Sequence, residues 1–507
     1  MSKENIKVNV KKVTKKEAEI DSNKGNKLRV VSRVFALIAT IINGFFLFRL
    51  LSTSVLPAKY AYPIMAVIVL ITLFYIFKAF RNKTKRATLI ILDILAVIFS
   101  AGFLFATVKI NEVFGFLDKN LNSNKQVAVY NVIVNKDAEY KKLDALKNKN
   151  IKTYEELVKD VSDEKLKDAV SKKISGATLT FSEDIEDVMS TVLKDKTAVI
   201  LVNEGTYGSY TDNNTEYAGK IRIIGTIEVE YENEVSEQKT DKNLTNTPFI
   251  IFLSGIDTRL DKMPTRSLSD VNMLIAVNPN TRKISMVTTP RDYYVQLHGT
   301  TGLRDKLTHA GSKGGVQLSQ ATLEDFYDVK VDRYVRVNFN FVMKLVDAIG
   351  GISVYQDVDK AMTTAAYKCK INPGWNEVDG KCALGFARER KSYSDGDRHR
   401  GRNQMHVIEQ ILKKVTSGTT ILSKYSQILK SLEGTFDSNI STEDITSLVR
   451  MQLDDMKSWN VESYSVNGKG AMTATYSYPN QNLYVMEPDM ATVETAKKKI
   501  QAVLNGE

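Results

Sequence analysis

Three long apolar runs stand close together near the start of the chain, and short polar segments separate them. The runs cover residues 30–56, 62–80 and 87–110. As a helix, each run is long enough to cross about 30 Å of hydrocarbon. A cleaved signal peptide has only one short apolar core, so it does not explain three such runs. We therefore predict three membrane-spanning helices over residues 30–110, in preference to a buried helical hairpin.

Lysine and arginine are distributed unevenly around these runs. Residues 1–29 are basic and lack an apolar period, which predicts a flexible basic tail. The second loop is also basic and holds no acid, whereas Lys59 is the only basic residue of the first loop. The positive-inside rule places the tail and the second loop in the cytoplasm. We therefore expect a multi-pass protein of the cell membrane whose domains after residue 110 are extracellular.

The following segment, residues 111–241, alternates short β-type runs with lysine-rich helical stretches. The β-type runs lie at residues 127–134, 197–203 and 221–231. The clearest helical stretch lies at residues 153–174. This alternation predicts a small extracellular α/β accessory domain. The segment contains no histidine and its carboxylates are scattered over charged faces, so we expect no catalytic site within it.

The pattern changes after residue 242, where apolar residues form continuous rather than alternating runs. These runs, typical of central strands covered on both faces, lie at residues 249–257, 271–279 and 283–292. Amphipathic stretches at 315–328 and 340–349 predict covering helices, and Gly350 and Gly351 should end the second. Further strand-like runs lie at residues 333–339, 352–355 and 383–389. We predict a layered α/β domain over 242–507, with a central mixed sheet flanked by helices.

The composition narrows the choice of partner. A formal net charge of +11 suits a nucleic-acid binder, but it suits equally a protein beside an anionic membrane or on a phosphorylated substrate. The cytoplasmic part has no helix-turn-helix pattern, so no nucleic-acid partner is expected. The two cysteines, Cys369 and Cys382, are too few for a thiolate zinc site of ordinary spacing. They form either one extracellular disulfide or two unpaired buried thiols.

Charged side chains gather at the predicted strand ends. Asp257 ends one apolar run, Asp270 begins the next, and Arg291 and Asp292 end the third. Open α/β sheets place their ligand crevices at such strand ends. Asp257 and Asp270 would be free to hold a divalent cation, and carboxylates beside phosphate oxygens suit Mg²⁺.

Arginines form a second cluster further along the chain. Arg388 and Arg390 are two residues apart, so in a strand they share one face, where their charges repel unless an anion joins them. A helix should then begin with Asp397 as its N-cap, and Arg400 and Gln404 share one face of it. Any one of these arginines alone would more often form a screened surface ion pair. Together, near strand ends and a helix N-terminus, they predict a site for phosphate oxygens.

An ordered series of motifs from residue 249 to about residue 415 resembles the LytR-CpsA-Psr family. The motifs read GID, SDVNMLIAVNP, TPRD, DKLTHA, VNF, VDAIGGI, DG with ALGFARER, and GDRHRGRNQ. Three spans followed by an accessory domain resemble its streptococcal capsule-associated, CpsA-type members. One position departs from the family. Where an arginine commonly stands two residues before the second aspartate, this chain has Leu268, and the nearest arginine is Arg266.

The resemblance implies transfer of a glycan, such as a capsular polysaccharide, from a polyprenyl pyrophosphate carrier onto peptidoglycan, with release of polyprenyl phosphate. It implies that Asp257 and Asp270 are the metal-side carboxylates for Mg²⁺. Seven residues would contact the pyrophosphate or its head group, namely Arg291, Arg388, Arg390 and Arg400, with Lys306, Asp397 and Gln404. Asp270 or Asp292 would accept the proton of the acceptor hydroxyl. Capsule synthesis proteins would be further partners, and His399 is the histidine expected nearest the phosphates.

Two other functions fit the same features. A membrane regulator could sense lipid or glycan with its outer domain and pass the signal to capsule or cell-wall synthesis. A lipid pyrophosphatase would use the same phosphate site with water as the acceptor. Both alternatives keep the membrane anchor. The pyrophosphatase differs from the transferase only in its acceptor, whereas the regulator would bind lipid or glycan without breaking or forming a bond.

We predict that Arg390→Ala abolishes turnover, with a loss of at least about 100-fold, without unfolding the domain. The guanidinium would otherwise stabilise charge that develops on the transferring phosphoryl group. The check is release of polyprenyl phosphate, with circular dichroism melting as the folding control. Retained activity in a folded variant would contradict the pyrophosphate role.

Overall fold

The computed structural model describes residues 3–54, 56–121, 125–156, 159–232, 242–258, 263–416, 428 and 431–507. The chain forms two compact units. The first comprises Met1–Gly115 and Ile445–Met456, and the second comprises Phe116–Asp444 and Lys457–Glu507. The first unit holds the apolar helices, and the second holds both of the domains that follow them.

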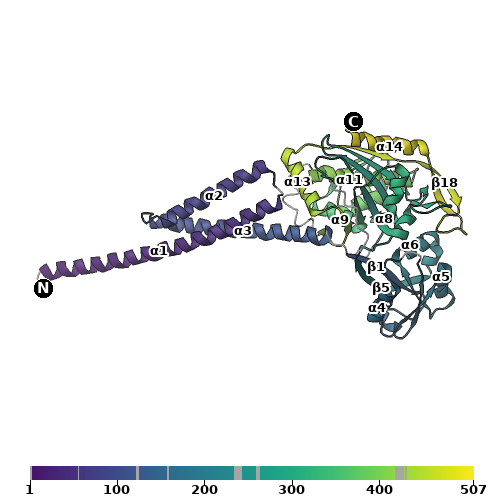
Figure 1. Ribbon diagram of the computed structural model, residues 1–507, viewed down its shortest axis with the longest axis horizontal. Helices are drawn as coiled ribbons and strands as arrows, with labels where there is room; N and C mark the ends of the chain where they lie inside the picture. The colour runs from purple at the N-terminus through teal and green to yellow at the C-terminus, as the bar shows by residue number, and fades with distance from the viewer. Residues whose placement is uncertain are drawn as a thin grey trace. The chain divides into compact units, whose positions relative to one another are not determined.

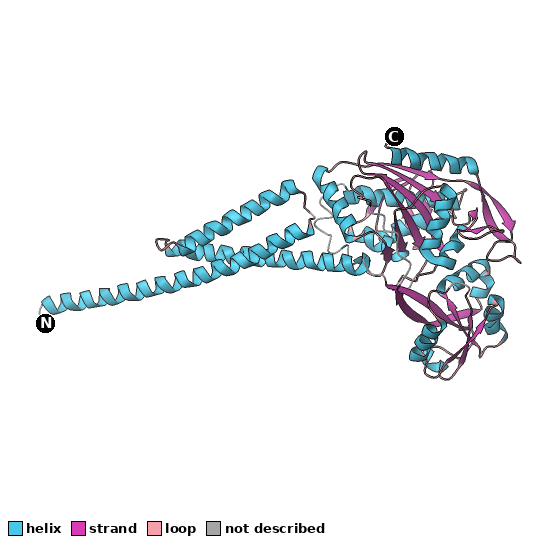
Figure 2. Cartoon of the chain, viewed as in Figure 1, coloured by secondary structure: helices cyan, strands magenta, loops and turns pink. Residues whose placement is uncertain are grey.

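Three long helices form most of the first unit, as predicted (Figure 1, Figure 2). They are α1 (Lys3–Thr53), α2 (Ala58–Phe80) and α3 (Arg86–Leu121). Each contains a stretch long and apolar enough to cross a membrane. The buried carboxylate of Asp93 on α3 accepts hydrogen bonds from Ser32 Oγ on α1 (2.7 Å) and from Tyr75 Oη on α2 (2.8 Å). This acid therefore joins the three helices instead of facing lipid.

The prediction of a flexible tail over residues 1–29 is wrong for the part that the structure describes, because α1 begins at Lys3. Residues 3–29 contain no proline and a single glycine, Gly25. Lysine, the commonest residue of this stretch, favours helix. The missing apolar period indicates that this part of α1 has no apolar face to bury, and it does not argue against a helix.

The accessory domain is built on a five-stranded sheet with the strand order β3-β2-β4-β1-β5. Its strands are β1 (Lys125–Asn135), β2 (Asn150–Tyr154), β3 (Thr178–Ser182), β4 (Val199–Asn203) and β5 (Ile221–Glu232). Its helices are η1 (Leu143–Leu146), α4 (Asp163–Lys173), α5 (Ile185–Lys194), α6 (Glu204–Asn213) and α7 (Thr215–Ala218). On β1, Val132 and Val134 enter one apolar core and Ile133 enters another. Since successive strand residues point to opposite faces, this sheet is covered on both sides.

The single helix predicted over residues 153–174 is wrong in its first part. Tyr154 ends β2, and α4 begins only at Asp163. The β-branched residue Thr153 is buried, and its Oγ1 donates to the carbonyl oxygen of Leu201 on β4 (2.8 Å), which favours the strand. Ser162 caps α4 by accepting a hydrogen bond from the backbone N–H of Lys165 (3.3 Å).

A six-stranded mixed sheet lies at the centre of the C-terminal domain, residues 242–507, with the order β16-β11-β6-β7-β8-β17. Its strands are β6 (Phe249–Ile256), β7 (Ser269–Asn278), β8 (Lys283–Thr289), β11 (Arg333–Asn338), β16 (Phe436–Ser438) and β17 (Asn460–Ser465). Strands β6, β7 and β8 are antiparallel, whereas β11 is parallel to β6 and β17 is parallel to β8. The predicted α/β class with a central mixed sheet is confirmed.

Helices pack around this sheet in two apolar cores. The helices of these cores are α8 (Leu307–Tyr327), α9 (Phe339–Ala348), α10 (Gly380–Arg388), α11 (Asp397–Thr416) and α14 (Met490–Asn505). Most of α13 (Thr442–Asp455) belongs to the first unit. Helices α8 and α14 share a core with β6, β7 and β8, and helices α9, α10 and α11 form a second core. Helix α9 stops as predicted, because Gly350 (φ +84°) and Gly351 (φ +79°) both turn into the left-handed region.

Short strands complete the C-terminal domain. They are β9 (Tyr294–Val295), β10 (Asp305–Lys306), β12 (Ile352–Gln356), β13 (Met362–Thr363), β14 (Lys370–Ile371), β15 (Gly374–Val378), β18 (Gly468–Thr473) and β19 (Leu483–Pro488). They pair as antiparallel hairpins, β9 with β10, β12 with β15, β13 with β14, and β18 with β19.

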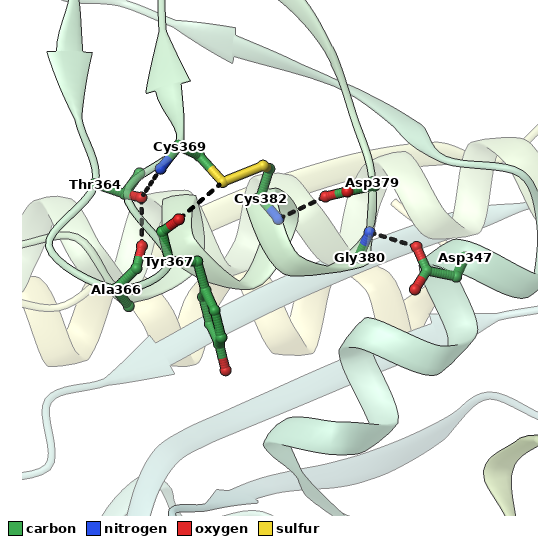
Figure 3. Close-up of a disulfide and its surroundings, with 8 residues drawn as sticks. All are labelled: Asp347, Thr364, Ala366, Tyr367, Cys369, Asp379, Gly380 and Cys382. Carbon is green, nitrogen blue, oxygen red and sulfur yellow. Dashed lines mark hydrogen bonds between the residues drawn. A yellow bond between two sulfur atoms is a disulfide. The ribbon is translucent and has the colours of Figure 1, made fainter.

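A disulfide joins Cys369 to Cys382, so the disulfide is the one of the two open alternatives that the structure adopts (Figure 3). It ties the segment before β14 to the first turn of α10. Asp379 caps α10 by accepting a hydrogen bond from the backbone N–H of Cys382 (2.9 Å). The N–H of Gly380 donates to Asp347 on α9 (2.7 Å), so the start of α10 is held from two sides.

We expect the denatured, unreduced chain to take up no alkylating agent, and the reduced chain to take up two groups. Intact mass spectrometry checks this. Cys369→Ser with Cys382→Ser should lower the free energy of unfolding by about 2–4 kcal/mol, because the disulfide restricts the unfolded chain. Alkylation of both thiols without reduction would contradict the pairing.

Candidate active site

Strand ends meet at one edge of the six-stranded sheet. Gly255 pairs with Val271 and Ile256 pairs with Ser269, with a bulge between them, so Asp257 and Asp270 leave neighbouring strands at the same edge. Thr289 ends β8 opposite Asn272, and Arg291 follows two residues later. The antiparallel pairing thus brings together charged residues that are far apart in the sequence.

A small cleft lies at this edge, between the sheet and the start of α11. Its lining residues are Asp270, Thr288, Thr289, Pro290, Arg291, Arg398, Arg400, Gly401, Gln404 and Ser465. Four residues expected from the sequence therefore meet in one place, one of them on β7, one after β8 and two on α11. Arg400 and Gln404 line the cleft together, as expected of positions one helical turn apart. Helix α11 begins at Asp397, whose side chain lies outside the described residues.

Arg291 is the centre of a cluster of carboxylates. The residue is 7% exposed. Its Nη1 donates to Oδ1 of Asp270 (2.5 Å), and its Nη2 forms an ion pair with Asp212. Its Nε lies 3.8 Å from Oδ1 of Asp292. Three acids thus surround one guanidinium, and the charge of Arg291 is compensated before any phosphate arrives.

Lys306 stands next to this cluster. Its Nζ donates to Oδ1 of Asn213 (3.2 Å) and lies 3.5 Å from Oδ1 of Asp292. The preceding residue, Asp305, is fully buried and bonds Nδ1 of His309 (2.6 Å). Burial by itself would raise the pKa of Asp305. The nearby His309 and hydrogen bonds from Ser477 and from the Lys306 backbone together outweigh burial, so the pKa of Asp305 is lowered. The Asp305–His309 pair therefore supports the backbone that presents Lys306.

The predicted strand over residues 383–389 is wrong, and so is the shared strand face of Arg388 and Arg390. These residues form the second half of α10, which begins at the Asp379 cap and buries Leu384 and Phe386. A short apolar run is ambiguous between strand and buried helix, and here the cap decides for helix. Arg390 is exposed, two residues after α10 ends.

Arg388 ends α10 and reaches the other strand end. Its Nη2 lies 3.4 Å from Oδ2 of Asp257, and its guanidinium carbon lies 4.1 Å from the centre of the Phe339 ring. This arginine is therefore oriented by a carboxylate and by an aromatic face. The Arg388–Asp257 pair is a second place where a guanidinium and a carboxylate meet at the sheet edge.

Arg266, the arginine nearest the departing position Leu268, does not lie in the cleft. It is 4% exposed, and it binds Glu156 Oε2 (2.9 Å) and Asp160 Oδ1 (2.9 Å) of the accessory domain. Burial raises the pKa of Glu156, and Arg266 opposes that shift. Arg266 therefore fastens the accessory domain to the C-terminal domain. A Cβ at Gly208 of α6 would lie 3.8 Å from the side chain of Leu268, so the leucine also lies where the accessory domain meets the C-terminal domain.

Asp212 and Asn213 are the residues that sequence reasoning missed. They end α6 of the accessory domain and bind the side chains of Arg291 and Lys306. At the other end of α6, burial raises the pKa of Glu204, and the carboxylate of Asp257 raises it further. Helix α6 therefore runs beside both strand ends. Nothing in the local pattern of residues 204–213 distinguishes them from an ordinary surface helix.

His399 does not reach the phosphate cleft as expected. Its ring stacks on that of Tyr393, with centroids 3.4 Å apart, and its Nε2 lies 3.2 Å from Asp357. Burial lowers the pKa of His399. The stacked ring supports the first turn of α11, and the cleft lining contains Arg398 and Arg400 instead.

Asp257 and Asp270 fit the requirements of Mg²⁺. Within the described residues, no group of three or more His, Cys, Asp or Glu side chains is arranged to hold a metal by itself. Mg²⁺ does not need one, since it is bound in proteins by one or two carboxylates together with substrate phosphates and water. Two carboxylates at neighbouring strand ends, each beside an arginine, match that donor set.

Comparison with known proteins identifies relatives of this chain. The model of the LytR_cpsA_psr family matches residues 220–499. Biofilm regulatory protein A of Streptococcus mutans is 33% identical over 244 residues, which cover 46% of this chain and 59% of that protein. The Enterococcus faecalis protein named polyisoprenyl-teichoic acid–peptidoglycan teichoic acid transferase TagU is 31% identical over 258 residues, covering 50% of this chain and 82% of that protein. Among solved structures, the crystal structure of Bacillus subtilis TagV aligns with 51% of this chain and 98% of the TagV chain. The aligned sequences are 27% identical and the TM-score is 0.43.

We expect Arg266→Met to destabilise the full chain by about 3–5 kcal/mol, because it leaves Glu156 and Asp160 buried without their cation. Chemical unfolding in detergent, followed by tryptophan fluorescence, measures the loss. Lys172→Met, which removes an exposed ion pair with Asp168, is the control and should change little. A loss below about 1 kcal/mol for Arg266→Met would show that the interdomain pair is not needed.

Proposed function

The chain belongs to the LytR-CpsA-Psr family, and from that premise we propose that it transfers a polyprenyl-pyrophosphate-linked glycan onto peptidoglycan. The observation that carries the proposal is the meeting of Asp270, Arg291, Arg400 and Gln404 in one cleft at the sheet edge. Converging arginines beside a helix N-terminus favour phosphate oxygens. Relatives named as teichoic acid transferases support the same reaction class, and we extend it here to capsular polysaccharide.

In the proposed reaction, a sugar hydroxyl of peptidoglycan attacks the phosphorus nearest the glycan. A phosphodiester bond forms, the bond to the bridging oxygen breaks, and polyprenyl phosphate leaves. No covalent enzyme intermediate is needed, because catalysis of phosphoryl transfer rests on positioning and on stabilisation of charge. Arg291 and Arg400 would bind the phosphate oxygens as negative charge develops on them.

The hydroxyl proton needs an acceptor, and two carboxylates are candidates. Asp270 lines the cleft, and Asp292 lies between Arg291 and Lys306. A general base must lie within hydrogen-bond reach of the attacking hydroxyl. The position of Asp270 in the cleft lining favours it over Asp292, which is not among the lining residues.

The remaining predicted residues would hold the head group from the sides. Arg388 ends α10 beside Asp257, and Arg390 follows it two residues later. Lys306 and Asp397 stand at the starts of α8 and α11. Bound at Asp257 and Asp270, Mg²⁺ would neutralise charge on the transferring phosphoryl group. The carrier is a membrane lipid, so an anchor of three spans with an extracellular C-terminal domain would keep the cleft close to its donor.

The test uses the full chain in detergent with a polyprenyl-pyrophosphate-linked oligosaccharide and peptidoglycan fragments. We expect Mg²⁺-dependent release of polyprenyl phosphate together with glycan-linked peptidoglycan, and loss of both products in a chelator. Arg400→Gln should reduce the rate by at least about 100-fold, because it removes a charged donor to the transition state. Arg402→Gln, on the same helix but outside the cleft lining, is the matched control and should stay near wild type.

Three results would contradict the transferase. Polyprenyl phosphate without glycan-linked peptidoglycan would indicate a pyrophosphatase. Binding of the lipid with no bond broken would indicate a sensor that regulates capsule or cell-wall synthesis. Equal rates for the Arg400→Gln and Arg402→Gln variants would remove the cleft from the reaction.

A further inference from the structure

One face of α6 in the accessory domain contacts the C-terminal domain, and its C-terminal end reaches Arg291 of the cleft. Gly205, Ser209, Asp212 and Asn213 recur at the spacing of a single helix face. Ser209 Oγ lies 3.0 Å from the hydroxyl of Tyr478, Asp212 pairs with Arg291, and Asn213 accepts from Lys306. The C-terminal end of this contact face is thus directed at two residues of the proposed donor site, Arg291 and Lys306.

Helix α6 is held firmly in this place. A Cβ at Gly205 would lie 2.5 Å from the carbonyl oxygen of Ser312 and 2.7 Å from Cβ of Arg266, so only glycine allows the helix to approach so closely. The buried Arg266 pairs with Glu156 and Asp160 beside it. The domains are therefore fixed to each other at the N-terminal end of α6.

Of the three carboxylates around Arg291, Asp212 is the easiest to displace. Its side chain is 31% exposed, whereas those of Asp270 and Asp292 are 13% and 18% exposed. It stands in the last turn of α6, where the helix dipole is negative and disfavours an acid. Its favourable electrostatic partner is Arg291. A stronger anion that binds Arg291 would therefore displace the carboxylate of Asp212.

We propose that Asp212 is a built-in stand-in for the donor phosphate, occupying the guanidinium of Arg291 until a pyrophosphate oxygen replaces it. This inference rests on the proposed function, because it assigns Arg291 to the pyrophosphate. Asp212 thereby sets the affinity for the donor. A carboxylate and a phosphate offer the guanidinium the same pair of acceptor oxygens, so one can replace the other without moving Arg291.

The exchange has a physical reason. A buried guanidinium without an anion is costly, and two cations side by side, Arg291 and Lys306, repel. Asp212 removes that cost in the free protein. The donor must then compete with the carboxylate, and its apparent affinity falls by the fraction of time that Arg291 is occupied. Salt weakens an ion pair that is one-third exposed more than it weakens the buried pairs.

The test measures binding of inorganic pyrophosphate to the full chain in detergent by calorimetry, with Arg291→Gln to identify the site. Asp212→Asn should tighten Arg291-dependent binding by about threefold to tenfold, because the amide keeps the shape and loses the charge. Asp212→Glu should stay near wild type. Asp168→Asn, which removes an exposed acid of the accessory domain far from α6 in sequence, is the control and should not change binding.

The transfer assay provides the second readout. Asp212→Asn should lower KM for the lipid-linked donor by a similar factor and leave kcat near wild type. Unchanged or weaker pyrophosphate binding in Asp212→Asn would overturn the stand-in role, as would a large loss of kcat at unchanged KM, which would make Asp212 a positioning residue. Absence of Arg291-dependent binding in the wild-type chain would instead overturn the proposed function, and this inference with it.

Discussion

The cost of burying a guanidinium governs the architecture of the second unit. Arg266 and Arg291 are both nearly inaccessible to water, at 4% and 7% exposure, and a buried positive charge is stable only beside an anion. In each case part of the anionic partner comes from the accessory domain, Glu156 and Asp160 for Arg266 and Asp212 for Arg291. The need to pair these two arginines therefore links the accessory domain to the sheet edge where the cleft lies.

The same rule acts among the apolar helices of the first unit. Asp93 is stabilised by two hydroxyl donors, Ser32 and Tyr75, one from each neighbouring helix. A carboxylate in an apolar environment is costly, so its two hydrogen bonds favour one arrangement of the three helices. In both units, polar contacts thus favour one arrangement of the packed elements, whereas apolar side chains form the cores.

Much of the fold could be predicted from the sequence because its signals are local. Span length, continuous apolar runs and the Gly350–Gly351 stop each depend on neighbouring residues, and they predicted the helices, the central strands and the end of α9. The strand assignment at 383–389 failed because a short apolar run does not distinguish a strand from a buried helix. The flexible-tail assignment failed because the absence of an apolar face was taken as the absence of a helix.

The same distinction between local and long-range signals applies to the residues of the candidate site. Asp270, Arg291, Arg400 and Gln404 could be placed together because strand ends and one helix face are local features that the topology brings to one edge. Asp212 and Asn213 could not, because their role arises from a contact between domains with residues 79 and 93 positions away in the chain. Leu268 lies beside Gly208 of the same helix, α6, which adds a carboxylate at Arg291. This carboxylate makes the cleft less positive, so the affinity of the cleft for a phosphate depends on how readily Asp212 is displaced.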